Sequence, residues 1–279
     1  MTSATPYAVG IGLVVENGLR CLVAVALIIA GSESLTAYGV ALVIGGAAAL
    51  LWPAALVPRR TGAGGLGTPL AFVSGASAGQ LLAQVTLTGG PVLLAAVNGA
   101  PAQVTALFAA LALFRAPYTF ALGLVSALTG RLTRLVEAGQ HDALRHIREG
   151  LIVATLATAG LGGLGGAWLG PDVMELVFGE GVSLDRGNTA LVAIGSVFAL
   201  ATLVLTVGLL ARGRTVAVAR TWLVAVPFGV VTNLLVPGSE LTRTCWTFVV
   251  VEFVAWGGFL LLEWRSDRRH GRLVGSQEH

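Results

Sequence analysis

One arginine, Arg115, lies near the middle of an otherwise apolar run, PAQVTALFAALALFRAPYTFALGLVSALTG. Its guanidinium has a permanent positive charge and a planar fork of donors that suits phosphate oxygens. As a helix, the run is long enough to cross a hydrocarbon layer about 30 Å thick. A charge at that depth costs about 2.5–3.5 kcal/mol on insertion scales, so it usually turns toward protein or water. Pro117 frees the carbonyl of Leu113 from its helical hydrogen bond, which predicts a kink beside the charge.

Two other apolar runs contain polar side chains. Ser77, Gln80 and Gln84 share one face of a helix predicted at 69–95. They either hydrogen-bond across a helix bundle or line a polar cavity, and the segment GASAG in the same run permits close helix contact. Glu252 lies near the middle of the last apolar run. It is either a functional carboxyl or a hydrogen-bonded structural one, and the sequence leaves both readings open.

The elements that position these residues are predicted to be membrane helices. With 55% hydrophobic residues, 11% charged residues and a mean hydropathy of +0.84, the chain does not have the composition of an ordinary soluble globule. Windows of about 20 apolar residues predict an all-α, polytopic membrane protein with about eight transmembrane helices. These are expected at 8–30, 36–57, 69–95, 102–128, 150–169, 188–210, 216–236 and 243–263.

The arginines are distributed unevenly between the two faces of this predicted bundle. All 17 basic residues are arginine, and 13 of them fall on alternate connections or on the C-terminal tail, against two on the opposite connections. The positive-inside rule therefore places both termini in the cytoplasm. The 13 are Arg59, Arg60, Arg131, Arg134, Arg145, Arg148, Arg212, Arg214, Arg220, Arg265, Arg268, Arg269 and Arg272.

Two connecting segments are predicted to lie on the membrane surface. Apolar residues alternate with arginines over 131–148, which predicts an amphipathic helix attracted to anionic membrane lipids, with a break near Gly139. A second short interfacial helix is expected from Pro171 on the other side. The segment GLGGLGG formally matches GxGxxG, but we reject a dinucleotide site because the motif needs a strand before it.

Several of these segments occur in an order that resembles a transporter family. The pieces are GGPVLLAAV, FRAPYTF, ALTGRLTRLVEAGQHDALR, GPDVMELVFGEG and ARGR, spread over about 130 residues. Together they resemble the multidrug/oligosaccharidyl-lipid/polysaccharide (MOP) exporter superfamily, in particular its bacterial polysaccharide-biosynthesis and O-antigen flippase branch. That family has two six-helix lobes facing a central cavity. The resemblance implies that 1–62 are the last two helices of the first lobe, 63–265 the complete second lobe, and 266–279 a basic cytoplasmic tail.

The chain departs from that family in two places. Four helices of the first lobe have no counterpart, and Leu128, Thr129 and Gly130 stand where these flippases often have a proline. A lone second lobe cannot enclose the cavity that alternating access requires. The resemblance therefore implies a truncated, split or degenerate member, completed either by a partner chain or by a homo-oligomer.

The resemblance implies a flippase or exporter of polyprenyl-diphosphate-linked sugars in the cytoplasmic membrane. Arg115 would contact the diphosphate, while Gln80, Gln84 and Ser77 would contact sugar hydroxyls. Glu252 would pair with Arg115 or take part in ion coupling. The alternative is a non-transporting membrane scaffold or partner subunit in envelope synthesis.

An enzyme is the least favoured class. The histidines lie in predicted cytoplasmic segments, and the chain has no HExxH or DDxxD sequence. No Walker A sequence is present either. We expect no catalytic residues, no metal, no cofactor and no nucleic-acid partner.

Overall fold

The computed structural model describes residues 18–19, 21–32, 37 and 67–275. The chain divides into two compact units, 1–65 and 66–279. Of the two helices expected in the first unit, the one at 36–57 lies almost entirely outside the described residues. The described part of the other, 18–19 and 21–29, is helical.

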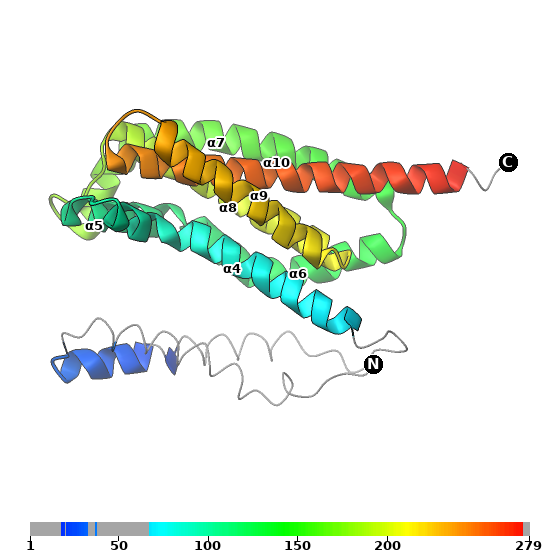
Figure 1. Ribbon diagram of the computed structural model, residues 1–279, viewed down its shortest axis with the longest axis horizontal. Coiled ribbons are helices and arrows are strands. Elements are labelled where there is room, and N and C mark those ends of the chain that lie inside the picture. The colour runs from blue at the N-terminus through cyan, green and yellow to red at the C-terminus, as the bar shows by residue number, and fades with distance from the viewer. Residues whose placement is uncertain (1–17, 20, 33–36, 38–66, 276–279) are drawn as a thin grey trace. The chain divides into compact units, whose positions relative to one another are not determined.

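The second unit consists of helices, and no strand occurs among the described residues (Figure 1). Five helical segments are long and apolar enough to cross a membrane: 78–96, 142–178, 186–210, 215–235 and 240–265. This confirms an all-α chain of membrane type. The helices are α4 Gly67–Ala96, α5 Pro101–Phe114, α6 Ala116–Glu137, α7 His141–Phe178, α8 Arg186–Ala211, α9 Thr215–Leu235 and α10 Glu240–Gly275.

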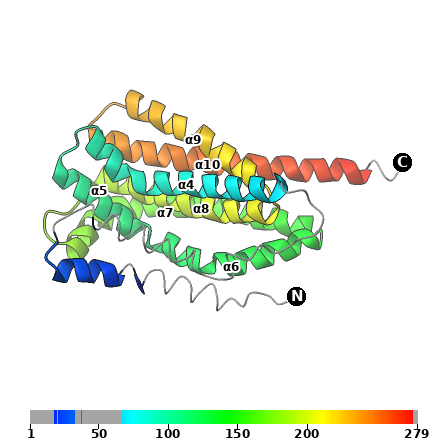
Figure 2. The same ribbon diagram turned by 60° about the horizontal axis from the view of Figure 1, so that its bottom comes forward.

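Helix α8 is the centre of this unit. It packs against α6, α7 and α10 (Figures 1 and 2), while α9 contacts both α4 and α10. A helix that is apolar on every side is buried, and α8 is apolar almost throughout. Its few polar side chains, such as Ser196 and Thr202, return hydrogen bonds to carbonyls one turn earlier. Two apolar clusters therefore form on opposite parts of α8, one around Leu107 and one around Phe259.

The helix predicted at 102–128 is two helices that meet at Arg115. Helix α5 ends at Phe114, Arg115 has φ −91° and ψ −2°, and α6 begins at Ala116. Pro117 has no N–H, so the normal hydrogen-bond ladder cannot continue through this point. The predicted kink is therefore present as a one-residue break in the helix at the arginine, whose backbone N–H still donates to the carbonyl oxygen of Leu111.

The separate amphipathic helix predicted at 131–148 is wrong. Helix α6 continues to Glu137, the chain turns at Gly139 with φ +63°, and α7 begins at His141. The break near Gly139 is confirmed, because only glycine adopts that backbone conformation without cost. Of the apolar side chains beside the break, Leu132, Leu135 and Leu144 are half-buried, whereas Ile147 is exposed.

The second interfacial helix, expected from Pro171, is also not separate. Helix α7 continues through Pro171 to Phe178. Three residues after the proline, Met174 is fully buried in the cluster around Leu107. Packing of this last part against the core outweighs the one backbone hydrogen bond that the proline removes.

Glycines allow α7 to lie directly against α8. A Cβ added at Gly163 or Gly166 would come within 2.9 Å of α8 side chains, and one at Gly170 would overlap Thr189. Gly160 and Gly165, which belong to the GxGxxG match, would meet nothing within 4 Å. All of these glycines lie inside a helix. Close helix contact is the role of Gly163, Gly166 and Gly170, as small residues commonly provide it in membrane bundles.

Candidate functional site

Glu252 lies in the interior of the helical unit, midway along the apolar part of α10. Only 1% of its surface is exposed. Its Oε2 accepts a hydrogen bond of 2.9 Å from the hydroxyl of Thr202 on α8. Its Oε1 is buried and has no hydrogen-bond partner within the described part of the chain. A buried acceptor without a donor is costly, so this oxygen is available to a small polar ligand.

Three acceptors lie within hydrogen-bonding distance of the Thr202 hydroxyl, which is more than its single proton can bond to. Besides Glu252, it lies 2.5 Å from the carbonyl oxygen of Phe198 and 3.1 Å from that of Ala199. A hydroxyl has one proton and donates it to one acceptor at a time. A proton on the Glu252 carboxyl would remove this competition, because the carboxyl could then donate to Thr202.

A small cavity of about 20 Å³ adjoins the Glu252 carboxyl. Gln80 of α4, Tyr118 of α6 and Trp222 of α9 also line it, so four helices besides α8 contribute. The indole Nε1 of Trp222 is a second buried polar atom without a partner among the described residues. A cavity of this size holds about one water-sized group. Donors and an acceptor therefore converge on a space suited to a water molecule or a small ion.

Arg115 lies close to this cluster, at the junction of α5 and α6. Its side chain is half-buried, and it interacts electrostatically with both Tyr118 and Glu252. Its guanidinium has no hydrogen bond or ion pair with any residue that the structure describes. The predicted pair with Glu252 is thus an electrostatic interaction between neighbours rather than a direct contact.

The structure brings together three of the five predicted site residues. Gln80 and Glu252 line the same cavity, and Arg115 lies within electrostatic range of it. Gln84 is half-buried on α4 but does not line this cavity. Ser77 belongs to α4, and its side chain lies outside the described part of the chain.

Three residues of the cluster were not singled out from the sequence. Tyr118 had a signal, because it follows Arg115 by three residues and such residues share a helix face. Thr202 had a weaker one, as a hydroxyl inside the apolar run VFALATLVL. Trp222 had none, since its position beside Glu252 depends on how α9 packs against α10.

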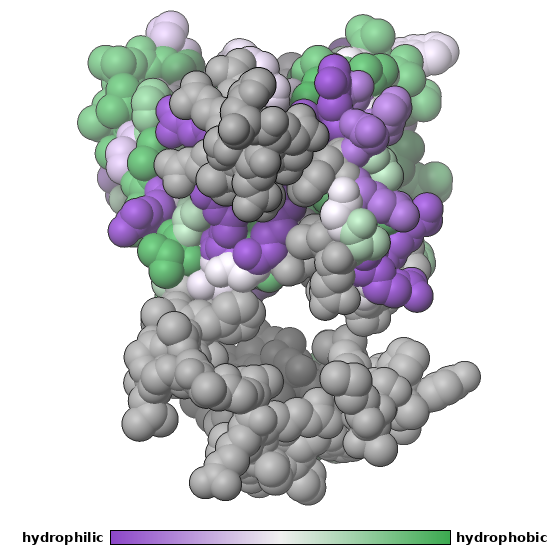
Figure 3. Space-filling model, turned by 90° about the vertical axis from the view of Figure 1, so that its right-hand side faces the viewer, coloured by the Kyte–Doolittle hydropathy of each residue, from purple (hydrophilic) through white to green (hydrophobic). Residues whose placement is uncertain are grey.

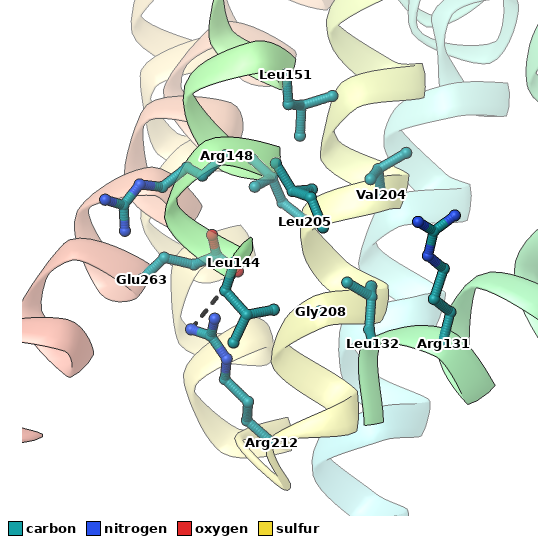
Figure 4. Close-up of a pocket in the computed structure, with 11 residues that line it drawn as sticks. Arg131, Leu132, Leu144, Arg148, Leu151, Val204, Leu205, Gly208, Arg212 and Glu263 are labelled. Carbon is teal, nitrogen blue, oxygen red and sulfur yellow. Dashed lines mark ion pairs between the residues drawn. The ribbon is translucent and has the colours of Figure 1, made fainter. Parts of the chain in front are cut away.

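Arginines gather at one end of the unit, where Figure 3 shows hydrophilic residues. One of them pairs with a buried acid, because Arg212 Nη1 lies 3.7 Å from Glu263 Oε1 (Figure 4). Arg148, which is also buried, lies nearby. Glu263 is 7% exposed, and its carboxylate lies over Gly208, where a Cβ would be 3.1 Å from Oε1. This cluster connects the ends of α7, α8 and α10.

A pocket of about 230 Å³ opens beside this charged cluster. Arg131 of α6 lies across it from Arg148 and Arg212, and leucines are the commonest residues in its walls (Figure 4). Within the described residues, no group of three histidine, cysteine or acidic side chains could hold a metal ion.

Comparison with known proteins yields no relative: no family model, curated protein or solved structure matches the chain.

Proposed function

We propose that the chain is a flippase or exporter-type transporter of the MOP kind, or part of one, that moves a polyprenyl-diphosphate-linked saccharide across the cytoplasmic membrane. The single observation that carries this proposal is the interruption between α5 and α6 at Arg115, within electrostatic range of the buried Glu252. Helices broken in the middle of a membrane typically mark substrate or ion sites in transporters.

The chemistry of the cluster suits this substrate. A diphosphate cannot enter hydrocarbon without a compensating cation, and Arg115 is half-buried beside a polar cavity. Gln80 offers an amide that can hydrogen-bond to sugar hydroxyls. Gln84 and Ser77 of the same helix are proposed to contact the sugar as well. Glu252, with an oxygen that lacks a partner, is suited to bind the coupling ion.

The opposite charges at the two ends of α7 support one orientation of the chain in the membrane. The exposed arginines Arg131, Arg134 and Arg145 lie at the end where α6 stops and α7 starts. Exposed acids, among them Asp172 and Glu175, lie at the other end of α7. By the positive-inside rule, the arginine-rich end faces the cytoplasm, and both termini with it.

Enclosing a substrate requires a second wall opposite this helical unit. The transporter proposal therefore includes either a partner chain or a second copy of this chain. The proposed roles need no further cofactor.

The test is transport by the purified full chain in vesicles, with a fluorescent polyprenyl-diphosphate sugar in one leaflet. Loss of leaflet asymmetry should be fast with the wild type and slowed at least about tenfold by Arg115→Ala, because a charge-assisted contact contributes more than about 1.4 kcal/mol. Arg134→Ala is the matched control, since Arg134 is an exposed arginine of α6 remote from the cavity. Its rate should equal that of the wild type.

Equal rates for Arg115→Ala and the wild type would reject the cavity role of Arg115. If the chain transports nothing alone or with co-purified proteins, yet retains a stable partner in a pull-down, the scaffold alternative is correct instead.

A further inference from the structure

An open groove follows the outer surface between α9 and α10, two helices that lie side by side (Figure 1). It has a volume of about 800 Å³. Its floor is formed by Gly257 and Gly258 of α10, and its sides by large apolar residues, including Phe228 and Phe253. A Cβ at Gly257 would meet nothing within 4 Å, so the glycine leaves real space there.

Three arginines surround one end of this groove, and none of the described residues that line it is acidic. Arg214 donates a hydrogen bond of 3.1 Å from Nη1 to the carbonyl oxygen of Leu262, which holds its guanidinium above the groove. Arg220 and Arg265 are exposed, and neither has an ion-pair partner among the described residues. This end therefore has a concentrated positive charge that suits an anion.

The length of the groove matches one leaflet of a bilayer. Arg265 and Phe253 are 12 residues apart on α10. At about 1.5 Å per residue this is about 18 Å, close to half of a hydrocarbon layer about 30 Å thick. A ligand with a charged head and an apolar tail of that length would place its head among the arginines and its tail beside Phe253.

We propose that this groove is a binding site for one anionic phospholipid. Arg214, Arg220 and Arg265 bind its phosphate, and one acyl chain lies over Gly257 toward Phe228. The site requires only that α9 and α10 lie in a bilayer, so it does not depend on the transport proposed above.

Native mass spectrometry of the purified full chain, titrated with phosphatidylglycerol or with phosphatidylcholine, tests the site. The wild type should bind one phosphatidylglycerol at least about tenfold more tightly than phosphatidylcholine, as expected for charge-assisted contacts. Arg220→Gln should weaken phosphatidylglycerol binding about tenfold by removing one of these contacts. Gly257→Leu should weaken binding of both lipids, because the new side chain fills the place of the acyl chain.

Two matched controls separate this site from general attraction to the surface. Arg134→Gln removes an exposed arginine at the same end that does not line the groove. Gly160→Leu adds a side chain on α7 where a Cβ also meets nothing within 4 Å. Both variants should bind phosphatidylglycerol within twofold of the wild type, and the melting temperature of every variant confirms folding.

Three results would overturn the proposal. The first is that Arg134→Gln and Arg220→Gln weaken phosphatidylglycerol binding equally, which would mean that the lipid is attracted to the charged surface without a specific site. The second is unchanged lipid binding in Gly257→Leu, which would place the acyl chain elsewhere. The third is full displacement of the lipid by millimolar inorganic phosphate, which would make this a site for a free anion.

Discussion

The hydroxyl of Thr202 on α8 donates to the buried carboxyl of Glu252 on α10 over 2.9 Å. This bond joins two helices of the core at a depth where neither side chain meets solvent, since both are at most 2% exposed. A polar contact in such a place stabilises the pairing of the two helices, because each partner would be costly to bury alone.

Thr202→Val is expected to lower the free energy of unfolding by about 1–3 kcal/mol, because it leaves the carboxyl without its donor. Unfolding in mixed micelles, followed by circular dichroism, measures the change. Thr158→Val, an exposed threonine of α7, is the control and should change stability by less than about 0.5 kcal/mol.

A double-mutant cycle isolates this interaction. In a Glu252→Leu background, Thr202→Val should cost much less, because no carboxyl remains to lose its donor. Equal costs in both backgrounds would show that the two residues do not interact.

Two adjacent glycines of α7 should respond in opposite ways to alanine. At Gly166 a Cβ would lie 2.9 Å from Ala193 Cβ and 3.2 Å from a backbone oxygen of α8, whereas at Gly165 it meets nothing within 4 Å. Gly166→Ala is expected to destabilise the protein by about 1–3 kcal/mol through overpacking. Gly165→Ala should stabilise it by up to about 1 kcal/mol, because alanine is the better helix former. The same unfolding assay measures both, and a neutral Gly166→Ala would contradict the close α7–α8 contact.

Two ion pairs at the arginine-rich end differ in burial. The side chains of Glu263 and Arg212 are 9% and 15% exposed, whereas those of Glu149 and Arg145 are 51% and 65% exposed. Glu263→Gln should destabilise by about 3 kcal/mol, because it removes one member of a largely buried pair. Glu149→Gln, the matched variant, should cost less than about 1 kcal/mol, since a solvated pair contributes little. Melting temperatures in detergent compare the two, and similar losses would mean that the Glu263 carboxylate is solvated.

The proposed orientation can be tested by thiol labelling in bacterial cells. In a background with Cys21→Ser and Cys245→Ser, an impermeant maleimide should label Asp172→Cys in intact spheroplasts. It should label Arg134→Cys only after lysis, because the arginine-rich end is expected to face the cytoplasm. The reverse pattern would invert the proposed topology.

Much of the architecture follows from composition and local pattern. The apolar runs around Thr202, Trp222 and Glu252 were each long enough for a membrane helix, and each forms a helix long and apolar enough to cross a membrane. Interruptions were also visible locally, because Pro117 and Gly139 act on the backbone within one turn. The separate interfacial helices expected at 131–148 and from Pro171 were wrong. For the second one, no local pattern reveals that the core would bury Met174.

Contacts between helices far apart in sequence could not be predicted from composition and local pattern. The pattern identified Arg115, Gln80 and Glu252 as polar residues in apolar runs, because a charge in hydrocarbon is conspicuous whatever surrounds it. Only the packing of α4, α6, α8, α9 and α10 placed Gln80, Tyr118, Thr202 and Trp222 around the same carboxyl. The hydropathy of a helix records how much of it leaves water, but not which neighbour each face meets. That choice depends on complementary shapes, such as the glycines of α7 against α8, which exist only once the helices have assembled.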